Sequence, residues 1–183
     1  MKKNLTVANF LTLLRILLVP IFLVLYLDQT FYLEGFPLFA VLVFLLAFCL
    51  DVLDGMIARK TNTVTDLGKV LDPLADKILR LSVLCAFMIN NVMPLYMFLI
   101  LLFIDLISIV LGAILYVKKI VVKSNIFGKI TTVIMSLSLF LCFFHNVIKP
   151  YDLVAVIVSI VLVLLTLIQY LVKYYKIYKN FQK

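Results

Sequence analysis

Six long apolar runs dominate this sequence of 183 residues, and the connections between them together with the two termini carry most of its charged residues. A helix that crosses a bilayer needs about 20 largely apolar residues. Runs of about that length lie near residues 10–27, 37–57, 73–92, 94–117, 130–148 and 152–172. The pattern predicts an all-α, polytopic membrane protein with six transmembrane helices. No segment reads as a separate soluble domain, so we expect residues 1–183 to form a single transmembrane domain.

The composition supports this prediction. Hydrophobic residues make up 66% of the chain and charged residues 14%, whereas a typical soluble domain is about 25% charged. The net charge of +8 does not indicate a nucleic-acid partner, because the basic residues lie between apolar runs rather than on one soluble face. We therefore expect membrane lipids, and no nucleic acid, around this chain.

The distribution of charge predicts the topology. Lys and Arg are concentrated at both termini and in the connections near residues 57–73 and 117–130. The remaining connections carry Asp28, Glu34 and Asp152, with Lys149 as their basic residue. Cytoplasmic loops carry the Lys and Arg excess of membrane proteins. We therefore expect a multi-pass protein of the cell membrane with both termini in the cytoplasm.

The acidic residues are clustered. Five of the nine lie between positions 51 and 76. Asp51 and Asp54 are three apart, and Asp72 and Asp76 are four apart, so each pair shares one helical face. Because the connection is short, we expect the second and third helices to be antiparallel neighbours, which would bring four carboxylates together near the cytoplasmic membrane boundary. Asp66, in the connection itself, is better explained as a solvated loop residue.

Carboxylates crowded together in this way repel each other unless cations lie among them. A set of oxygen ligands without His or Cys favours a hard divalent ion, Mg²⁺ or Mn²⁺. Four carboxylates could hold two such ions about 3.5–4 Å apart, as in two-metal phosphoryl transfer. The sequence therefore predicts a metal site formed by Asp51, Asp54, Asp72 and Asp76.

Small residues lie beside these acids. Gly55, Ala58 and Gly68 would let a phosphate-bearing group approach the backbone closely. Arg59 follows at once, and its planar guanidinium suits a diphosphate. Together with the metal site, these residues predict a site for a nucleotide diphosphate joined to a lipid.

The segment from Asp51 to Asp76 matches the pattern D-x2-D-G-x2-A-R-x8-G-x3-D-x3-D at all eight specified positions. This pattern is the signature of the CDP-alcohol phosphatidyltransferase family, which the chain therefore resembles. Two further segments are similar to motifs of that family: Asn9-Phe-Leu-Thr12-Leu-Leu-Arg15 and Phe127-Gly128-Lys129.

The resemblance implies an activity, namely transfer of a phosphatidyl group from CDP-diacylglycerol to an alcohol with release of CMP. It implies that the four signature aspartates hold divalent ions and that Asp76 is the general base for the acceptor hydroxyl, although Asp76 could instead serve mainly as a ligand. It also implies that Gly55, Ala58, Arg59 and Gly68 shape the CDP site, that the site opens on the cytoplasmic side, and that the protein forms a homodimer.

The acceptor is less well defined. The stretch from Lys60 to Lys77 is most similar to members that use glycerol 3-phosphate and make phosphatidylglycerophosphate. Lys129 and Arg80 are candidates to bind such a phosphate-bearing acceptor, although each is also explained as a basic residue at the cytoplasmic boundary.

The fourth helix departs from that pattern. Members that use glycerol phosphate commonly carry an Arg-Glu pair there, and cardiolipin synthases carry Arg-Asp. This chain has Ile104-Asp105 and lacks the Arg. Asp105 within a span is a functional candidate by default, or else a packing residue paired with a base such as Arg15. The alternative is therefore a cardiolipin synthase that uses phosphatidylglycerol.

A membrane transporter with a carboxylate cation site is the remote alternative. Transporters place polar residues near the bilayer midplane in several spans, often with repeat symmetry. Here the acidic residues gather at one cytoplasmic edge, which favours an enzyme.

Overall fold

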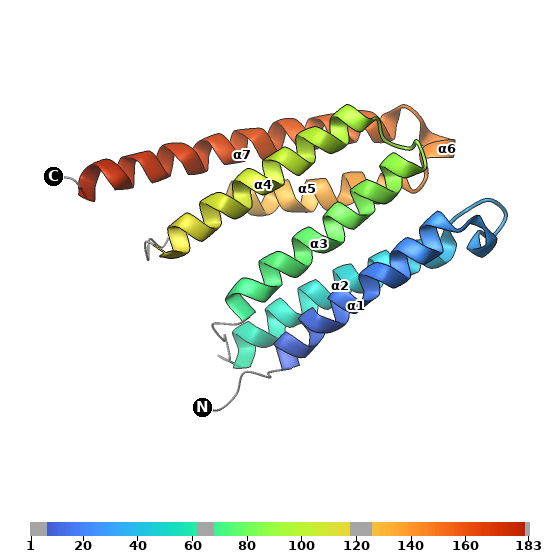
Figure 1. Cartoon of the computed structure of the whole chain (residues 1–183), viewed down its shortest axis with the longest axis horizontal. Helices are drawn as coiled ribbons and strands as arrows, with labels where there is room; N and C mark the ends of the chain where they lie inside the picture. The colour runs from blue at the N-terminus through green and yellow to red at the C-terminus, as the bar shows by residue number, and fades with distance from the viewer. Residues whose placement is uncertain (1–6, 62–67, 118–125, 182–183) are drawn as a thin grey trace. The chain divides into compact units, whose positions relative to one another are not determined.

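The computed structural model describes residues 7–61, 68–117 and 126–181, and helices make up nearly all of these ranges (Figure 1). The elements are α1 (Val7–Leu27), the short 3-10 helix η1 (Gln29–Phe31), α2 (Leu38–Thr61), α3 (Gly68–Ile89), α4 (Leu95–Val117), α5 (Ile126–Cys142), α6 (His145–Ile148) and α7 (Tyr151–Phe181). Within the described ranges no named strand occurs, and one isolated bridge joins Leu33 and Phe36. The prediction of an all-α chain is confirmed.

Six of these helices overlap the six predicted ranges, but three boundaries differ. α3 begins at Gly68 rather than near residue 73, and α7 continues to Phe181 rather than ending near 172. In both places the helix runs beyond its apolar part, and hydropathy marks only the apolar part. α5 ends at Cys142 rather than near 148, because the chain turns at Phe143 and Phe144 and begins the separate helix α6.

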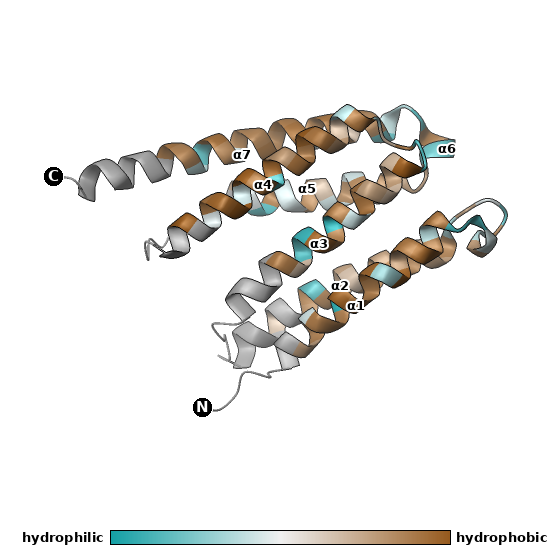
Figure 2. Cartoon of the chain, in the orientation of Figure 1, coloured by the Kyte–Doolittle hydropathy of each residue, from teal (hydrophilic) through white to brown (hydrophobic). Residues whose placement is uncertain are grey.

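Three described helices are long and apolar enough to cross a membrane: Phe10–Leu27 in α1, Leu95–Gly112 in α4 and Tyr151–Val172 in α7. Shorter apolar segments occur at Leu38–Leu53 and Phe127–Cys142. Large hydrophobic side chains are exposed along the helices, as at Leu17, Phe103 and Val133, and Figure 2 shows the helices as mainly hydrophobic. Surfaces of this kind are typical of contact with lipid. The helices are therefore those of a membrane protein.

The helices form two compact units, Met1–Asn91 and Val92–Lys183. In the first unit, α1 packs along both α2 and α3 (Figure 1). Among the described residues, α2 and α3 are each packed mainly against α1 rather than against each other. The first helix therefore holds together the two helices that carry the signature.

The end of α1 is fixed by polar contacts with the connection that follows and with α3. The Tyr32 hydroxyl donates a hydrogen bond of 2.7 Å to the carbonyl oxygen of Tyr26, and the Asn90 side-chain amide donates to the same oxygen at 3.3 Å. Burial raises the pKa of the Tyr32 hydroxyl, which keeps it protonated and able to donate. The Tyr26 ring also meets the Phe87 ring edge-on. The two hydrogen bonds satisfy the Tyr26 carbonyl oxygen, which lies in the last turn of the helix and lacks a partner within it.

In the second unit, α5 packs along α7, and α4 also contacts α7. The Thr131 and Thr166 hydroxyls lie 3.1 Å apart, and the Ser138 hydroxyl donates to the Ala155 carbonyl oxygen at 3.1 Å. Side-chain hydrogen bonds of this type join helices in membranes, where water does not compete for them. They fix how α5 and α7 align along their lengths.

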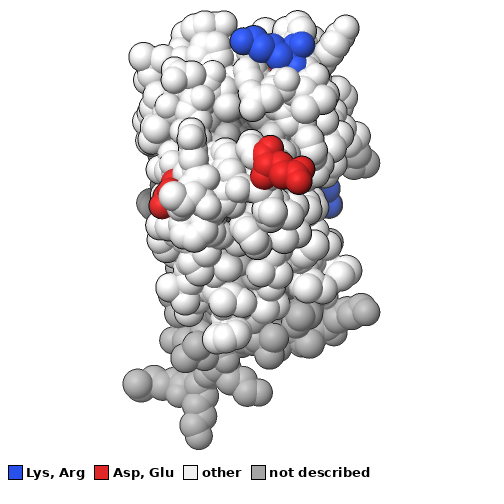
Figure 3. All heavy atoms as spheres, turned by 90° about the vertical axis from the view of Figure 1, so that its right-hand side faces the viewer, with Lys and Arg blue, Asp and Glu red and all other residues white. Residues whose placement is uncertain are grey.

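A buried hydrogen bond between two side chains closes the turn between α5 and α7. His145 Nδ1 lies 2.6 Å from Asp152 Oδ2, and the Asp152 side chain is fully buried. The sequence analysis placed Asp152 on the side opposite the predicted cytoplasmic side, and His145 falls within the predicted fifth span. Because its side chain is buried and contacts His145, Asp152 is a structural residue. Figure 3, which views the right-hand side of Figure 1, shows a surface that is mainly uncharged with small acidic and basic patches.

We expect Asp152→Ala to lower the free energy of unfolding by about 1–3 kcal/mol, because it leaves the buried His145 side chain without its hydrogen-bond partner. The measurement is reversible denaturation in detergent followed by circular dichroism. Glu34→Gln, which alters an exposed acidic residue in another connection, should change stability by no more than about 0.5 kcal/mol. Equal effects of the two substitutions would contradict the structural role of the pair.

Candidate active site

Asp51, one residue of the predicted site, forms an ion pair that joins α2 to α1. The Arg15 Nη1 atom lies 2.8 Å from Asp51 Oδ1. Arg15 is fully buried, whereas the Asp51 side chain is 46% exposed. A signature carboxylate is thus held on one side by a buried cation while it reaches the surface.

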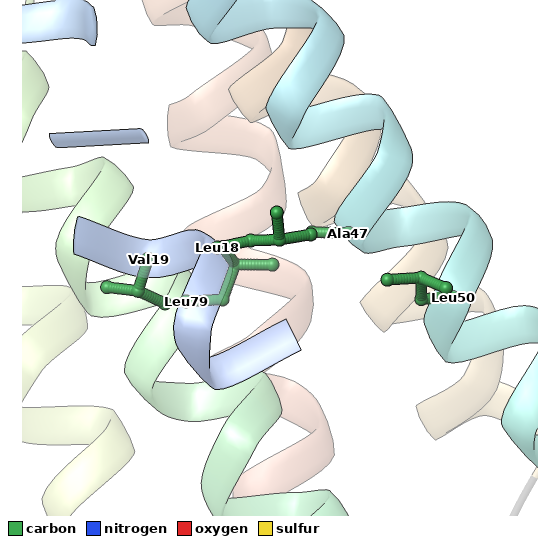
Figure 4. Close-up of a cluster of buried hydrophobic side chains, with 5 residues drawn as sticks. All are labelled: Leu18, Val19, Ala47, Leu50 and Leu79. Atoms are coloured by element: carbon green, nitrogen blue, oxygen red, sulfur yellow. The ribbon is translucent and has the colours of Figure 1, made fainter. Parts of the chain in front are cut away.

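An apolar cluster lies next to this pair. It consists of Leu18 and Val19 of α1, Ala47 and Leu50 of α2, and Leu79 of α3 (Figure 4). Three polar residues lie within one helical turn of cluster members: Arg15 is three residues before Leu18, Asp51 follows Leu50, and Asp76 is three residues before Leu79. Because the cluster joins the three helices, it places these residues at a similar level along them.

Asp76 is exposed in α3, and Arg80, one turn later, is half-buried. The exposure of Asp76 leaves its carboxylate accessible to a ligand. Arg80 lies on the same helical face as Asp76 because four residues separate them. Asp76, the predicted general base, and Arg80, predicted to bind the acceptor substrate, therefore lie close together in α3.

Several predicted site residues have side chains outside the described residues, although their backbones are helical. Asp54, Gly55, Ala58 and Arg59 lie in the last turns of α2, and Gly68 and Asp72 lie in the first turns of α3. Among the described side chains there is no group of three or more His, Cys, Asp or Glu residues suited to a metal ion. The helical spacing still places Asp54 one turn from Asp51, and Asp72 one turn from Asp76.

The remaining candidates lie in the second unit. Lys129 is exposed near the start of α5, and Asp105 is buried in α4, next to buried Ile104. A Cβ added at Gly128 would lie 3.3 Å from the Tyr170 hydroxyl. The glycine therefore lets Tyr170 of α7 approach α5 closely beside Lys129. The glycine motif in the sequence did not reveal that Tyr170 is the residue it accommodates.

The donor set fits a hard divalent ion. The four signature aspartates supply only carboxylate oxygens, and both that have described side chains, Asp51 and Asp76, reach the surface. Mg²⁺ and Mn²⁺ prefer oxygen ligands of this type.

Sequence comparison shows what the chain is similar to. The profile of the family described as CDP-alcohol phosphatidyltransferase matches residues 5–173. A CDP-diacylglycerol–glycerol-3-phosphate 3-phosphatidyltransferase of Aquifex aeolicus (strain VF5) is 38% identical over 181 residues, covering 93% of this chain and 96% of the relative. A protein of the same name from Bacillus subtilis (strain 168) is 33% identical, covering 80% of each chain.

A cardiolipin synthase (CMP-forming) of Streptomyces coelicolor (strain ATCC BAA-471 / A3(2) / M145) is 39% identical, but the match covers only 54% of this chain and 46% of the relative. The family match, by contrast, extends through both compact units. The signature aspartates, the Phe127–Lys129 motif and the helices that carry them all fall within it. The chain therefore belongs to the CDP-alcohol phosphatidyltransferase family.

Proposed function

We propose that this chain transfers a phosphatidyl group from CDP-diacylglycerol to glycerol 3-phosphate, releasing CMP and forming phosphatidylglycerophosphate. The observation that carries the proposal is the position of signature residues Asp51 and Asp76 beside one apolar cluster that joins α1, α2 and α3. The two relatives matched over most of their length carry the name of this activity. Together these observations support both the reaction type and the acceptor.

In the proposed mechanism, Asp51, Asp54, Asp72 and Asp76 would together hold two Mg²⁺ or Mn²⁺ ions. Such ions, when bound, withdraw charge from a diphosphate and stabilise the leaving CMP. Gly55, Ala58 and Gly68 leave room for the CDP group, and Arg59 pairs with its phosphates. These residues bind and orient the lipid nucleotide.

The acceptor hydroxyl attacks the phosphorus atom that carries the diacylglycerol group. The new P–O bond forms as the bond to CMP breaks, and Asp76 takes the proton of the hydroxyl. Exposure of the Asp76 side chain is consistent with this role. Lys129 and Arg80 are proposed to bind the acceptor phosphate, and Asp105 to bear on acceptor choice.

We also propose that six helices, α1–α5 and α7, cross the cell membrane with both termini in the cytoplasm. The concentration of basic residues at the termini and in the connections after α2 and α4 supports this orientation. It places the site on the cytoplasmic side, where the water-soluble acceptor is available.

A cardiolipin synthase that uses phosphatidylglycerol is the second candidate, favoured by Ile104-Asp105 in α4 and by the match to the Streptomyces coelicolor protein. The experiment is to incubate the purified full-length protein in detergent with CDP-diacylglycerol, Mg²⁺ or Mn²⁺, and one acceptor at a time. We expect CMP release with glycerol 3-phosphate. Release with phosphatidylglycerol alone would identify the second candidate, and no release with any alcohol would contradict the family activity for this chain.

A further inference from the structure

The signature does not include α1, yet α1 supplies a fully buried charge to the site. Arg15 is buried, and its Nη1 atom lies 2.8 Å from Asp51 Oδ1. An arginine guanidinium stays charged at any ordinary pH, so a buried arginine can hold a carboxylate in place by an ion pair. The pair therefore requires explanation beyond helix packing.

The surroundings of Arg15 restrict its movement. One turn further along α1, Leu18 and Val19 are buried in the apolar cluster with Ala47 and Leu50 of α2. Thr12, one turn earlier, is also fully buried. A guanidinium confined between buried neighbours has few alternative positions, so the place that it gives the Asp51 carboxylate is well defined.

The two ends of the ion pair differ in exposure. The Arg15 side chain is 1% exposed, and the Asp51 side chain is 46% exposed. The contact uses Oδ1 of Asp51. The Asp51 carboxylate is therefore held by a buried cation and is still exposed enough to bind a ligand.

We propose that Arg15 is a positioning residue that fixes the orientation of the Asp51 carboxylate for metal binding. The proposal rests on the proposed function, in which Asp51 is a metal ligand. Residues that hold a ligand through a hydrogen bond or ion pair commonly raise metal affinity, and their loss costs about 10–100-fold in affinity or activity. Arg15 itself touches neither the metal nor the substrate.

The test measures metal binding directly. Full-length protein with Arg15→Met, which keeps an apolar chain of similar length in the buried position, is titrated with Mn²⁺ in detergent without lipid substrate. Electron paramagnetic resonance of free Mn²⁺ then gives the dissociation constant. We expect Arg15→Met to bind Mn²⁺ about tenfold more weakly than the parent protein. Arg15→Lys should bind with an intermediate affinity, because it keeps the charge but lacks the planar fork.

Two further variants separate positioning from stability. Phe22→Leu alters another fully buried residue of α1; it should lower the melting temperature but leave the Mn²⁺ dissociation constant unchanged. In an Asp51→Asn background, adding Arg15→Met should cause no additional loss of affinity, because Arg15 acts through Asp51. If Arg15→Met does not fold, Arg15→Lys in the same comparison carries the test.

Three outcomes would overturn the proposal. Unchanged Mn²⁺ affinity in a folded Arg15→Met protein would show that the contact between Arg15 and Asp51 serves helix packing only. Tighter binding would show that Arg15 only balances the negative charge of the aspartates. If the parent protein binds no Mn²⁺, the metal site is refuted, and the proposed function with it. If the parent binds Mn²⁺ and Arg15→Met binds it equally well or more tightly, only the role of Arg15 is refuted.

Discussion

Asp72→Asn should lower the rate of CMP release by about 10³-fold or more while leaving the protein folded in detergent. Asp72 lies in α3 one turn before Asp76 and is a proposed metal ligand. Stabilisation of phosphoryl charge by a bound metal is worth several kcal/mol, and about 4 kcal/mol corresponds to 10³-fold in rate. An amide keeps the size of the side chain but loses its negative charge.

The control for this experiment is Asp66→Asn. Asp66 belongs to the same acidic stretch but not to the signature positions, so we expect its substitution to leave the rate within about twofold of the parent value. Circular dichroism and gel filtration establish that both variants are folded. Near-normal turnover by Asp72→Asn would exclude this residue as an essential ligand.

Removal of divalent ions should reduce CMP release to background. The four signature aspartates would then face one another without cations, and the charge that develops on the leaving CMP would lack its main stabilisation. The measurement is the rate of CMP release after treatment with EDTA and gel filtration. Addition of Mg²⁺ or Mn²⁺ should restore it.

Ca²⁺ serves as the matched ion. It carries the same charge but prefers longer bonds and a larger number of ligands than Mg²⁺, so we expect it to restore little activity. The melting temperature before and after EDTA treatment shows whether the fold survives. Full turnover by protein that elemental analysis shows to be free of divalent metal would refute the metal-dependent mechanism.

The helices themselves could be predicted because their apolar runs are as long as a bilayer is thick. The ends were harder to predict where polar residues continue a helix, as in α3 and α7, or where the chain turns early, as after Cys142 in α5. Hydropathy records which residues tolerate lipid, whereas helix boundaries depend on the backbone and on local contacts. The predicted ranges therefore locate the helices correctly but give their first and last residues less accurately.

The signature residues could also be predicted, but their supporting partners could not. Sequence analysis gave Arg15 as part of a segment similar to a family motif and as a possible partner for Asp105, and the structure gives it an ion pair with Asp51. In a membrane protein the side that faces lipid is as apolar as the side that faces other helices, so hydropathy does not reveal how a helix is rotated. The pairing of His145 with Asp152 was missed for a related reason, since it depends on the turn after α5.

The position of Arg15 also bears on how the chain enters the membrane. Arg15 is encoded 36 residues before its partner (51 − 15), so α1 is synthesised while its positive charge still lacks Asp51. An arginine at the centre of an isolated helix is disfavoured by about 2.5–3.5 kcal/mol during translocon-mediated insertion, and one in the first third of a span, as here, by less. The nascent first helix is consequently less stable in lipid than its apolar length suggests, and arrival of the second helix completes its integration.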